Sequence, residues 1–295
     1  MATKTAMITI AGRPNVGKST LTNYLVGEKI AIVSNKPQTT RNRICGIVTR
    51  EDTQFIFVDT PGFHNPRTKL GDYMVNVVKE SVADVDLTIL VVEPVANVGA
   101  QEKALIEQLK ARKCPAVLAI NKIDTAEKDA LLEVIAVYSQ ENAFEEIIPI
   151  SAKTGDGIDA LLNICGKYAV ESPFLFPEDS TTDQPERQVM AEIIREKILW
   201  NLDREVPHGT AVEITKFSER DSGIIDIDAT IYCEKASHKG IIIGKHGDML
   251  KKISSMARMD CEKFMGTRVY LTTWVKIKEN WRDSDFLVRN FGYSE

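Results

Sequence analysis

Short apolar runs alternate with amphipathic stretches over the first 170 or so residues of the chain. Continuous apolar runs predict buried strands, and apolar residues at every third or fourth position predict helices. The strands are expected at 7–11, 45–49, 54–59, 87–93, 116–121 and 147–151, and the helices at 18–26, 70–82, 100–111, 127–139 and 158–168. This alternation predicts an α/β domain with a mostly parallel sheet, whose ligands bind at the carboxyl ends of the strands.

The pattern changes between residues 171 and 188, where three prolines flank an acidic, hydroxyl-rich run. Such a composition is typical of a linker. We therefore expect a first domain at 1–172, a linker at 173–187 and a second domain at 188–295. The second domain is predicted to be smaller and α+β, with a helix at 189–202, strands at 210–218 and 226–233, helices around a Gly-x-x-Gly loop, a strand at 268–278 and a C-terminal helical extension.

Composition places the chain among ordinary globular proteins. It has 295 residues, of which 43% are hydrophobic and 27% charged, a length that suits two domains. No apolar run approaches the roughly 18–20 residues that a membrane span needs. The first motif begins too close to the N-terminus to leave room for a signal peptide. Five scattered cysteines without a Cys-x-x-Cys pair indicate reduced thiols in a cytosolic protein, not disulfides or a zinc site.

Charge is distributed unevenly along the chain. The net charge is −5, but residues 1–186 hold 19 basic and 25 acidic side chains, whereas residues 187–295 hold 18 and 17. Within residues 235–282 there are 11 basic and 4 acidic side chains. This local excess indicates a polyanionic partner, and a solvated lysine-rich surface is the alternative.

One segment between the first predicted strand and helix matches the phosphate-binding pattern GxxxxGK[ST] at every fixed position. Such a turn directs backbone N–H groups and a helix N-terminus at one point, which favours an anion. Lys18 is expected to reach the outer phosphates of a nucleotide, and the Ser19 hydroxyl to bind magnesium. A glycine-rich turn without a ligand is the alternative for this segment alone. The predicted contact residues are Gly12, Arg13, Pro14, Asn15, Val16, Gly17, Lys18, Ser19 and Thr20.

A second element, Asp59-Thr60-Pro61-Gly62, follows the third predicted strand. The Asp59 carboxylate is expected to hold magnesium through water, and the Gly62 N–H to bond a terminal phosphate that exists only before hydrolysis. Asp-x-x-Gly is also common turn chemistry, so this element has little weight alone.

The base is identified by Asn121-Lys122-Ile123-Asp124, after the fifth predicted strand. The Asp124 carboxylate can accept from both the ring N–H and the amino group of guanine, whereas adenine lacks these donors. The Lys122 stem would cover the base, and Ser151-Ala152-Lys153 would offer a backbone N–H to the guanine carbonyl. Four motifs in this order resemble a GTPase of the translation-factor class.

That resemblance assigns roles to the neighbouring loop residues. GTPases of this class use one loop threonine as a magnesium ligand, for which Thr40 is the first candidate and Thr39 the second. Phe63 stands where Ras-like enzymes have a water-orienting glutamine, so we expect slow hydrolysis. In related GTPases an asparagine at the position of Asn15 accompanies a bound potassium ion. We therefore take Lys18, Thr40, Asp59, Gly62 and Asn15 as the catalytic set, Ser19, Thr40 and Asp59 as the magnesium set, and potassium stimulation as a hypothesis.

The second domain contains Gly244-Lys245-His246-Gly247 between apolar helical residues. In K-homology (KH) domains of the second topological type, such a loop joins two helices and clamps the backbone of single-stranded RNA. The order of predicted elements and the positive charge agree with this module. A helix-loop-helix that merely packs on the first domain is the alternative. The predicted RNA contacts are Ile241, Ile243, Gly244, Lys245, His246, Gly247, Lys251, Lys276 and Lys278.

Aromatic and histidine side chains near this loop have two interpretations each. Trp274 and Trp281 alternate with basic residues and either stack on bases or belong to the core. His238 and His246 stand beside glycine and lysine, which predicts solvated rings and argues against a metal site.

The whole series, GRPNVGKS, TTRxR, DTPG, NKxD and SAK followed by a single GKHG module, closely resembles the bacterial Era GTPases. The resemblance covers nearly the whole chain. It implies a GTPase that helps to mature the small (30S) ribosomal subunit, binds the 3′ end of 16S ribosomal RNA through the KH domain, and gates that binding with GTP. It further implies a cytoplasmic protein, which we expect to be a monomer, and leaves peripheral association with the inner face of the cell membrane open.

Three functions remain to be separated. The first is a GTP-dependent switch that presents an RNA-binding domain. The second is an RNA-binding module whose nucleotide only adds stability. The third is a GTPase whose second domain docks a protein or membrane partner. The first is favoured because the motifs of both sites are complete.

Overall fold

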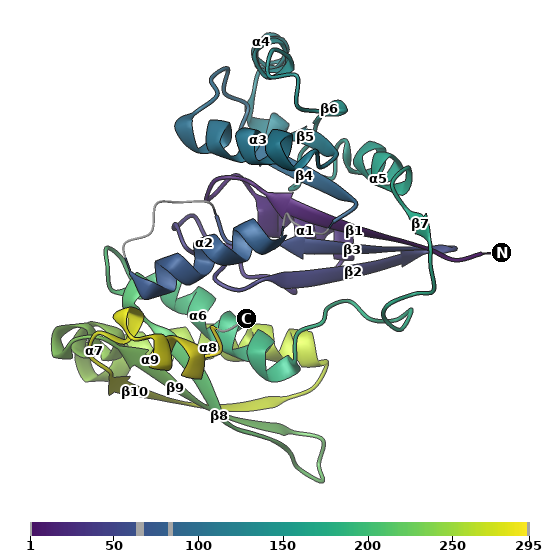
Figure 1. The fold of residues 1–295 in the computed structure, drawn as a ribbon. Coiled ribbons are helices and arrows are strands. Elements are labelled where there is room, and N and C mark those ends of the chain that lie inside the picture. Colours follow the sequence, from purple (N-terminus) through teal and green to yellow (C-terminus); the bar gives the residue numbers. More distant parts are fainter. Residues whose placement is uncertain (1, 63–67, 82–84, 294–295) are drawn as a thin grey trace. The chain divides into compact units, whose positions relative to one another are not determined.

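The computed structural model describes residues 2–62, 68–81 and 85–293. Packing divides the chain into two compact units, each with its own sheet and core (Figure 1). The first unit comprises Met1–Ala31, Thr40–Asn65 and Met74–Asp183. The second comprises Gln184–Glu295 together with two short segments from earlier in the sequence, Ile32–Thr39 and Pro66–Tyr73.

The first unit is built on a mostly parallel sheet with the strand order β2-β3-β1-β4-β5-β6. β2 runs antiparallel to β3, and the short β7 runs antiparallel to β1. All six predicted strands are present, whereas β7, of two exposed residues, was not predicted. The strands are β1 (Lys4–Ala11), β2 (Ile44–Arg50), β3 (Thr53–Asp59), β4 (Leu87–Val92), β5 (Ala116–Ile120), β6 (Glu146–Pro149) and β7 (Val170–Glu171).

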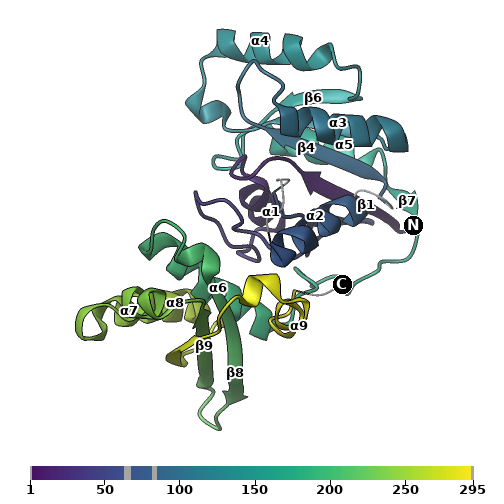
Figure 2. The same ribbon diagram turned by 60° about the vertical axis from the view of Figure 1, so that its left-hand side comes forward.

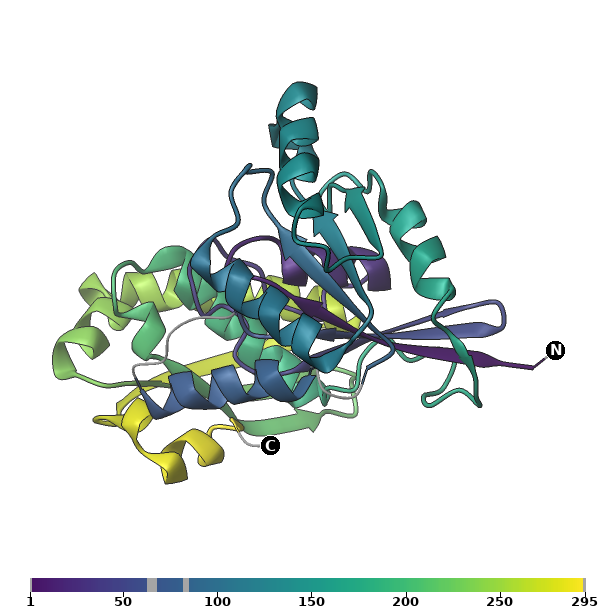
Figure 3. The same ribbon diagram turned by 45° about the horizontal axis from the view of Figure 1, so that its top comes forward.

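Helices cover both faces of this sheet (Figures 1 and 3). One face packs α1 and α5 through a core that includes Leu21, Ile10 and Leu161. The other packs α2, α3 and α4 through a core that includes Ile106 and Leu118. The predicted helices are confirmed as α1 (Lys18–Val26), α2 (Lys69–Ser81), α3 (Ala100–Arg112), α4 (Lys128–Ser139) and α5 (Ile158–Gly166), with a 3₁₀ turn η1 (Ile123–Thr125).

The second unit has the order helix, two strands, two helices, strand that its sequence predicts. Its sheet has the order β10-β9-β8, with β9 and β10 parallel and β8 and β9 antiparallel; the β8–β9 hairpin is clear in Figure 2. The elements are α6 (Glu186–Asn201), η2 (Pro207–Gly209), β8 (Ala211–Glu219), β9 (Ile225–Cys233), α7 (Ala236–Ile243), η3 (Lys245–Gly247), α8 (Asp248–Met265), β10 (Val269–Ile277), η4 (Trp281–Asp283) and α9 (Asp285–Asn290).

The core of the second unit lies between its helices and one face of its sheet. Ile194 and Ile198 of α6 and Ile253 and Ala257 of α8 are fully buried with strand residues such as Ile227. In the part of the chain that the structure describes, no helix is both long and apolar enough to span a bilayer.

The structure distinguishes the two tryptophans that the sequence left open: one is buried and the other is exposed. Trp281 is fully buried, its Nε1 donates to the Gly209 carbonyl at 2.9 Å, and its ring meets Phe291 edge-on at 5.3 Å. Trp274 is 57% exposed. His238 is 5% exposed, so the prediction of a solvated ring was wrong; it lies on the buried side of α7, whereas His246 is exposed.

Because Trp281 fills the core, we expect Trp281→Ala to destabilise the second unit by about 3–5 kcal/mol, the usual cost of removing a buried aromatic ring. Trp274→Ala, the matched exposed control, should change stability by no more than about 0.5 kcal/mol. Hydrogen exchange of β8 and β9 peptides in the full-length chain measures both variants locally. Equal protection of the two variants would contradict the core assignment.

Candidate nucleotide site and nucleic-acid loop

The loop between β1 and α1 owes its shape to two glycines. Gly12 and Gly17 have φ of 150° and 101°, and Asn15 has φ of 67°. A Cβ on Gly12 would overlap the Val91 carbonyl oxygen. Gly17 is the N-cap of α1 and no side chain caps the helix, so its first N–H groups are available to an anion.

Lys18 lies buried inside this loop. Its Nζ donates to the carbonyl oxygens of Gly12 (3.2 Å) and Arg13 (2.9 Å). Burial lowers the pKa of Lys18 to about 8, although Asp59 opposes the shift. A buried ammonium with neutral partners is costly, so an anion in the loop would stabilise its charged form.

Three oxygen-bearing side chains meet beside Lys18. Ser19 Oγ donates to Asp59 Oδ2 at 2.7 Å and lies 2.8 Å from Thr40 Oγ1. Asp59 is fully buried, and its Oδ1 has no hydrogen-bond partner among the described residues. Burial raises the pKa of Asp59 to about 6, with Lys18 and Ser19 acting in the opposite direction. Hydroxyl and carboxylate oxygens, one of them unsatisfied, fit a hard divalent cation such as Mg²⁺.

The residues after Asp59 return to the phosphate loop. Thr60 Oγ1 donates to the Ile10 carbonyl at 2.9 Å, which fixes the turn at the end of β3. A Cβ on Gly62 would come within 2.8 Å of the Pro14 backbone, so only glycine fits at this approach. Phe63 lies outside the described residues.

Asn121 joins the loop after β1 to the two segments that are predicted to bind the base. Its Nδ2 donates to the Val16 carbonyl at 2.8 Å, and its Oδ1 accepts from the Ala152 N–H at 2.9 Å. Val16, Asn121 and Ala152 follow β1, β5 and β6, so this amide joins three strand ends. The predicted convergence at the carboxyl edge of the sheet is confirmed.

Two of the side chains predicted to recognise the base, Asp124 and Ser151, are in contact. Asp124 is exposed, and its Oδ1 accepts from the Ser151 hydroxyl at 2.7 Å. Ser151 is buried and also accepts from the Thr154 N–H at 3.2 Å, while Lys153 is exposed. Ser151 thus orients a carboxylate that remains open to a ligand.

Two ion pairs that the sequence did not predict hold residues of the loop between β1 and α1. Lys122 Nζ donates to the Asn15 carbonyl at 2.7 Å and pairs with Glu93 at the end of β4. Arg13 pairs with Glu102 of α3, a carboxylate only 1% exposed. Glu93 could have been predicted as a site residue, because it is a polar residue directly after a buried strand. Glu102 could not, because it fits the helical pattern of α3 like its neighbours.

The Gly-x-x-Gly loop joins α7 and α8 as predicted. Gly244 and Gly247 have φ of 75° and 86°, and His246 between them has φ of 53°. A Cβ on Gly244 would lie 2.6 Å from Met249 Cβ, whereas nothing lies within 4 Å of one on Gly247. The structure therefore needs glycine for space at the first position and for backbone conformation at the second.

The remaining predicted RNA contacts are accessible. Ile242 is fully buried, whereas Ile241 is 49% exposed and Ile243 is half-buried against the core. The exposed cationic or titratable side chains of this set are Lys245, His246, Lys251, Lys276 and Lys278. The described residues contain no group of three His, Cys, Asp or Glu side chains that could hold a metal.

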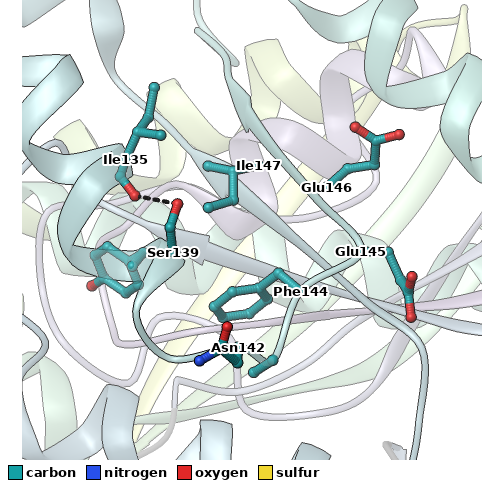
Figure 4. Close-up of a pocket in the computed structure, with 9 residues that line it drawn as sticks. Ile135, Ser139, Asn142, Phe144, Glu145, Glu146 and Ile147 are labelled. Carbon is teal, nitrogen blue, oxygen red and sulfur yellow. Dashed lines mark hydrogen bonds between the residues drawn. The ribbon is translucent and has the colours of Figure 1, made fainter.

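A separate hollow of about 320 Å³ lies between the end of α4 and β6 (Figure 4). Its lining includes Ile135, Phe144 and Glu145, and Ser139 Oγ donates to the Ile135 carbonyl at 2.7 Å. None of the motif residues lines it, so it is not part of the nucleotide site.

Two family models match the chain. The first, described as a 50S ribosome-binding GTPase, covers residues 7–122, and the second, a KH domain, covers residues 205–282. The first matched range contains the phosphate loop, and the second contains the Gly-x-x-Gly loop.

Relatives and solved structures match over nearly the full length. The GTPase Era of Ruminiclostridium cellulolyticum is 54% identical over 99% of this chain and 98% of its own, and that of Clostridium perfringens is 50% identical over 99% of both. The fold superposes with a TM-score of 0.94 on a crystal structure of Era with MgGDPNP and nucleotides 1506–1542 of 16S ribosomal RNA. That Era is 36% identical, over 99% of this chain and 100% of the other. The TM-score is also 0.94 for a variant of Aquifex aeolicus Era bound to GDP and AlF₄⁻, 37% identical over the same shares. With its phosphate loop, base-recognition motifs and Gly-x-x-Gly loop all in place, the chain belongs to the Era family of GTPases.

Proposed function

We propose that this GTPase is a GTP-dependent switch that binds the 3′ end of 16S ribosomal RNA and assists assembly of the 30S ribosomal subunit. The main support is the solved Era that matches the whole chain and holds both a GTP analogue with magnesium and nucleotides 1506–1542 of 16S RNA. The nucleotide site belongs to the proposed domain 1–172 and the RNA site to 188–295, joined by the linker 173–187.

GTP is held by main-chain and side-chain groups with different tasks. The phosphates occupy the loop Gly12 to Thr20, where the α1 N-terminus and Lys18 neutralise their charge. Asp124 accepts from the donor edge of guanine, and the Lys122 stem and the Ala152 N–H complete the base pocket. Asp59 to Gly62 place an N–H near the terminal phosphate.

Ser19, Thr40 and Asp59 form the magnesium set. The Ser19 hydroxyl already lies within hydrogen-bond distance of both the Thr40 hydroxyl and the Asp59 carboxylate, and Asp59 Oδ1 is buried without a partner. When bound, Mg²⁺ supplies positive charge that stabilises the phosphate oxygens as the bond to the terminal phosphoryl group breaks. Lys18 acts on the same phosphates, and Gly62 and Thr40 distinguish GTP from GDP.

RNA is bound by the Gly-x-x-Gly loop of the second unit. The Gly244 and Gly247 backbone lets single-stranded phosphates approach closely, and Lys245 and His246 face them. Lys251, Lys276 and Lys278 add longer-range attraction, and Ile241 and Ile243 offer apolar surface to unstacked bases. Docking of a protein or membrane partner instead has no observation in its favour.

The site of action follows from the ribosomal target. We infer that the protein works as a monomer in the cytoplasm, where ribosomal subunits assemble. Association with the inner face of the membrane stays a prediction from family resemblance.

Asp124→Asn should shift base preference from guanine toward xanthine nucleotides, because xanthine carries a carbonyl where guanine carries an amino group. A buried or semi-buried group left without its partner costs about 1–3 kcal/mol, so GTP affinity should fall about tenfold or more. Calorimetric titration of both proteins with GDP and with xanthosine diphosphate measures this change of base preference. Asp129→Asn, a change of the same kind in the first turn of α4, is the control, and unchanged preference in Asp124→Asn would refute the pocket assignment.

Replacing both Gly244 and Gly247 with aspartate should abolish binding of a 16S 3′-end oligonucleotide while GTP affinity stays unchanged. The new carboxylates repel phosphates, and a side chain at Gly244 has no room beside Met249. Gly223→Asp, at a glycine of similar φ in the β8–β9 turn, is the control. Binding by the unmodified protein and by the control should weaken steeply as salt rises, since bound phosphates release counterions. Full RNA affinity at matched salt would support the docking alternative.

If Asn15 helps to hold a potassium ion at the phosphates, GTP hydrolysis should be faster in potassium than in sodium salts at matched ionic strength. The ion would supply the positive charge that an arginine finger gives elsewhere. Asn15→Ala should remove the difference between the salts. Equal wild-type rates in both would eliminate the hypothesis.

A further inference from the structure

The phosphate loop has a left-handed turn at a residue that is not glycine. Asn15 has φ of 67°, a region that residues with a side chain adopt at a cost, although asparagine tolerates it better than most. Its side chain is exposed. The Asn15 carbonyl oxygen accepts a hydrogen bond from Lys122 Nζ at 2.7 Å. A side chain from the segment predicted to bind the base therefore holds this turn of the loop.

The backbone of Lys122 is fixed by its own local turn. The residue has φ of 66° and directly precedes η1. Its carbonyl oxygen accepts from the Thr125 N–H at 2.9 Å and from the Thr125 hydroxyl at 2.8 Å. A lysine side chain has a flexible four-carbon stem, so a fixed backbone does not by itself place Nζ. Another contact has to select the rotamer that reaches the phosphate loop.

Glu93 supplies this contact from the end of β4. It directly follows a strand whose residues are all buried, and its carbonyl oxygen accepts from the Val95 N–H at 2.8 Å. Its Oε1 accepts from Lys122 Nζ at 2.5 Å, and its Oε2 lies 3.8 Å from Arg13 Nη2 of the phosphate loop. The carboxylate therefore lies between the lysine ammonium and a cation of the loop.

This ion pair matters more for geometry than for stability. The side chains of Glu93 and Lys122 are 35% and 37% exposed, and pairs this open to water add little to the free energy of unfolding. A carboxylate beside a site for a polyphosphate also repels the ligand's charge. Net charge therefore argues against an acid at this position, whereas the direction in which the Lys122 side chain extends gives a reason for one.

We propose that Glu93 is a positioning residue for guanine-nucleotide binding. It holds Lys122 Nζ against the Asn15 carbonyl, so that the lysine stem covers the base while the phosphate loop keeps its left-handed turn. The inference rests on the proposed roles of Lys122 and of the phosphate loop. Glu93, Lys122 and Asn15 all belong to the first compact unit.

The first test measures GDP affinity by calorimetry for Glu93→Met and Glu93→Gln in the full-length protein. Both changes remove the same negative charge, but only glutamine keeps an oxygen that can accept from Lys122. We expect GDP affinity to fall about threefold to tenfold in Glu93→Met, the usual effect of one lost hydrogen bond, and by less in Glu93→Gln. If Glu93 acted through its charge alone, both variants would bind GDP more tightly than the wild type.

Glu107→Met is the matched control. Glu107 is an exposed acid of α3 in the same unit, and it pairs with Lys110 of its own helix at 3.7 Å. Its removal should change GDP affinity by less than about twofold. A fall equal to that of Glu93→Met would show a general effect of losing a paired acid and would overturn the proposal.

An unchanged or raised GDP affinity in Glu93→Met would overturn the proposal as well. If that variant does not fold, Glu93→Gln decides, because it is nearly isosteric with the wild type and the side chain is partly exposed. A lowered GDP affinity in Glu93→Gln supports the positioning role, and a raised one rejects it.

A double-variant cycle separates this inference from the proposed role of Lys122. If Glu93 acts through Lys122, adding Glu93→Met to Lys122→Met should change GDP affinity by no more than about twofold. A full additional loss would show that Glu93 acts by another route and would reject the inference. If Lys122→Met itself keeps the wild-type affinity, the proposed role of Lys122 fails first.

Discussion

The nucleotide site depends on one amide side chain that spans three loops. Asn121 donates to the Val16 carbonyl and accepts from the Ala152 N–H, so the loops after β1, β5 and β6 keep a common geometry. In a parallel sheet these loops emerge at one edge, but the sheet alone does not fix the distances between them. A buried amide whose oxygen and nitrogen are both hydrogen-bonded does fix the distances between these loops. The segments predicted to hold the phosphates and the base are therefore joined before any ligand binds, and such preorganisation lowers the ordering entropy that binding costs.

The same site contains two buried ionisable groups whose charged forms are poorly stabilised by the protein alone. Burial lowers the pKa of Lys18 to about 8 and raises that of Asp59 to about 6, so both groups are strained toward their neutral forms. The two shifts have opposite signs and are relieved by opposite partners, phosphate for the lysine and a divalent cation for the carboxylate. A nucleotide with its cation, in the place proposed above, would relieve both together. Free phosphate or free cation would relieve only one.

Local pattern predicted most of this architecture. Apolar runs such as 116–121 and helical periods such as 158–168 appear in the structure with ends within three residues, because a buried strand or helix face imposes its period directly on the sequence. The nucleotide motifs were found because phosphate and guanine demand fixed residue types at fixed spacing. β7 was not predicted because a strand of two exposed residues is too short to show a pattern of apolar and polar positions. The membership of Ile32–Thr39 in the second unit arises from partners far along the chain, such as Glu196, which no local window contains.

The second glycine of the RNA loop combines open space with a left-handed backbone. Nothing surrounds the place where a side chain would begin at Gly247, and only its φ of 86° excludes ordinary residues. That φ is unfavourable for one handedness of the α-carbon and comfortable for its mirror image. A chemically ligated chain carrying D-alanine at this point would keep the loop's course while losing the freedom that glycine has in solution. Chirality at a single atom would then stiffen the Gly-x-x-Gly loop without adding a contact.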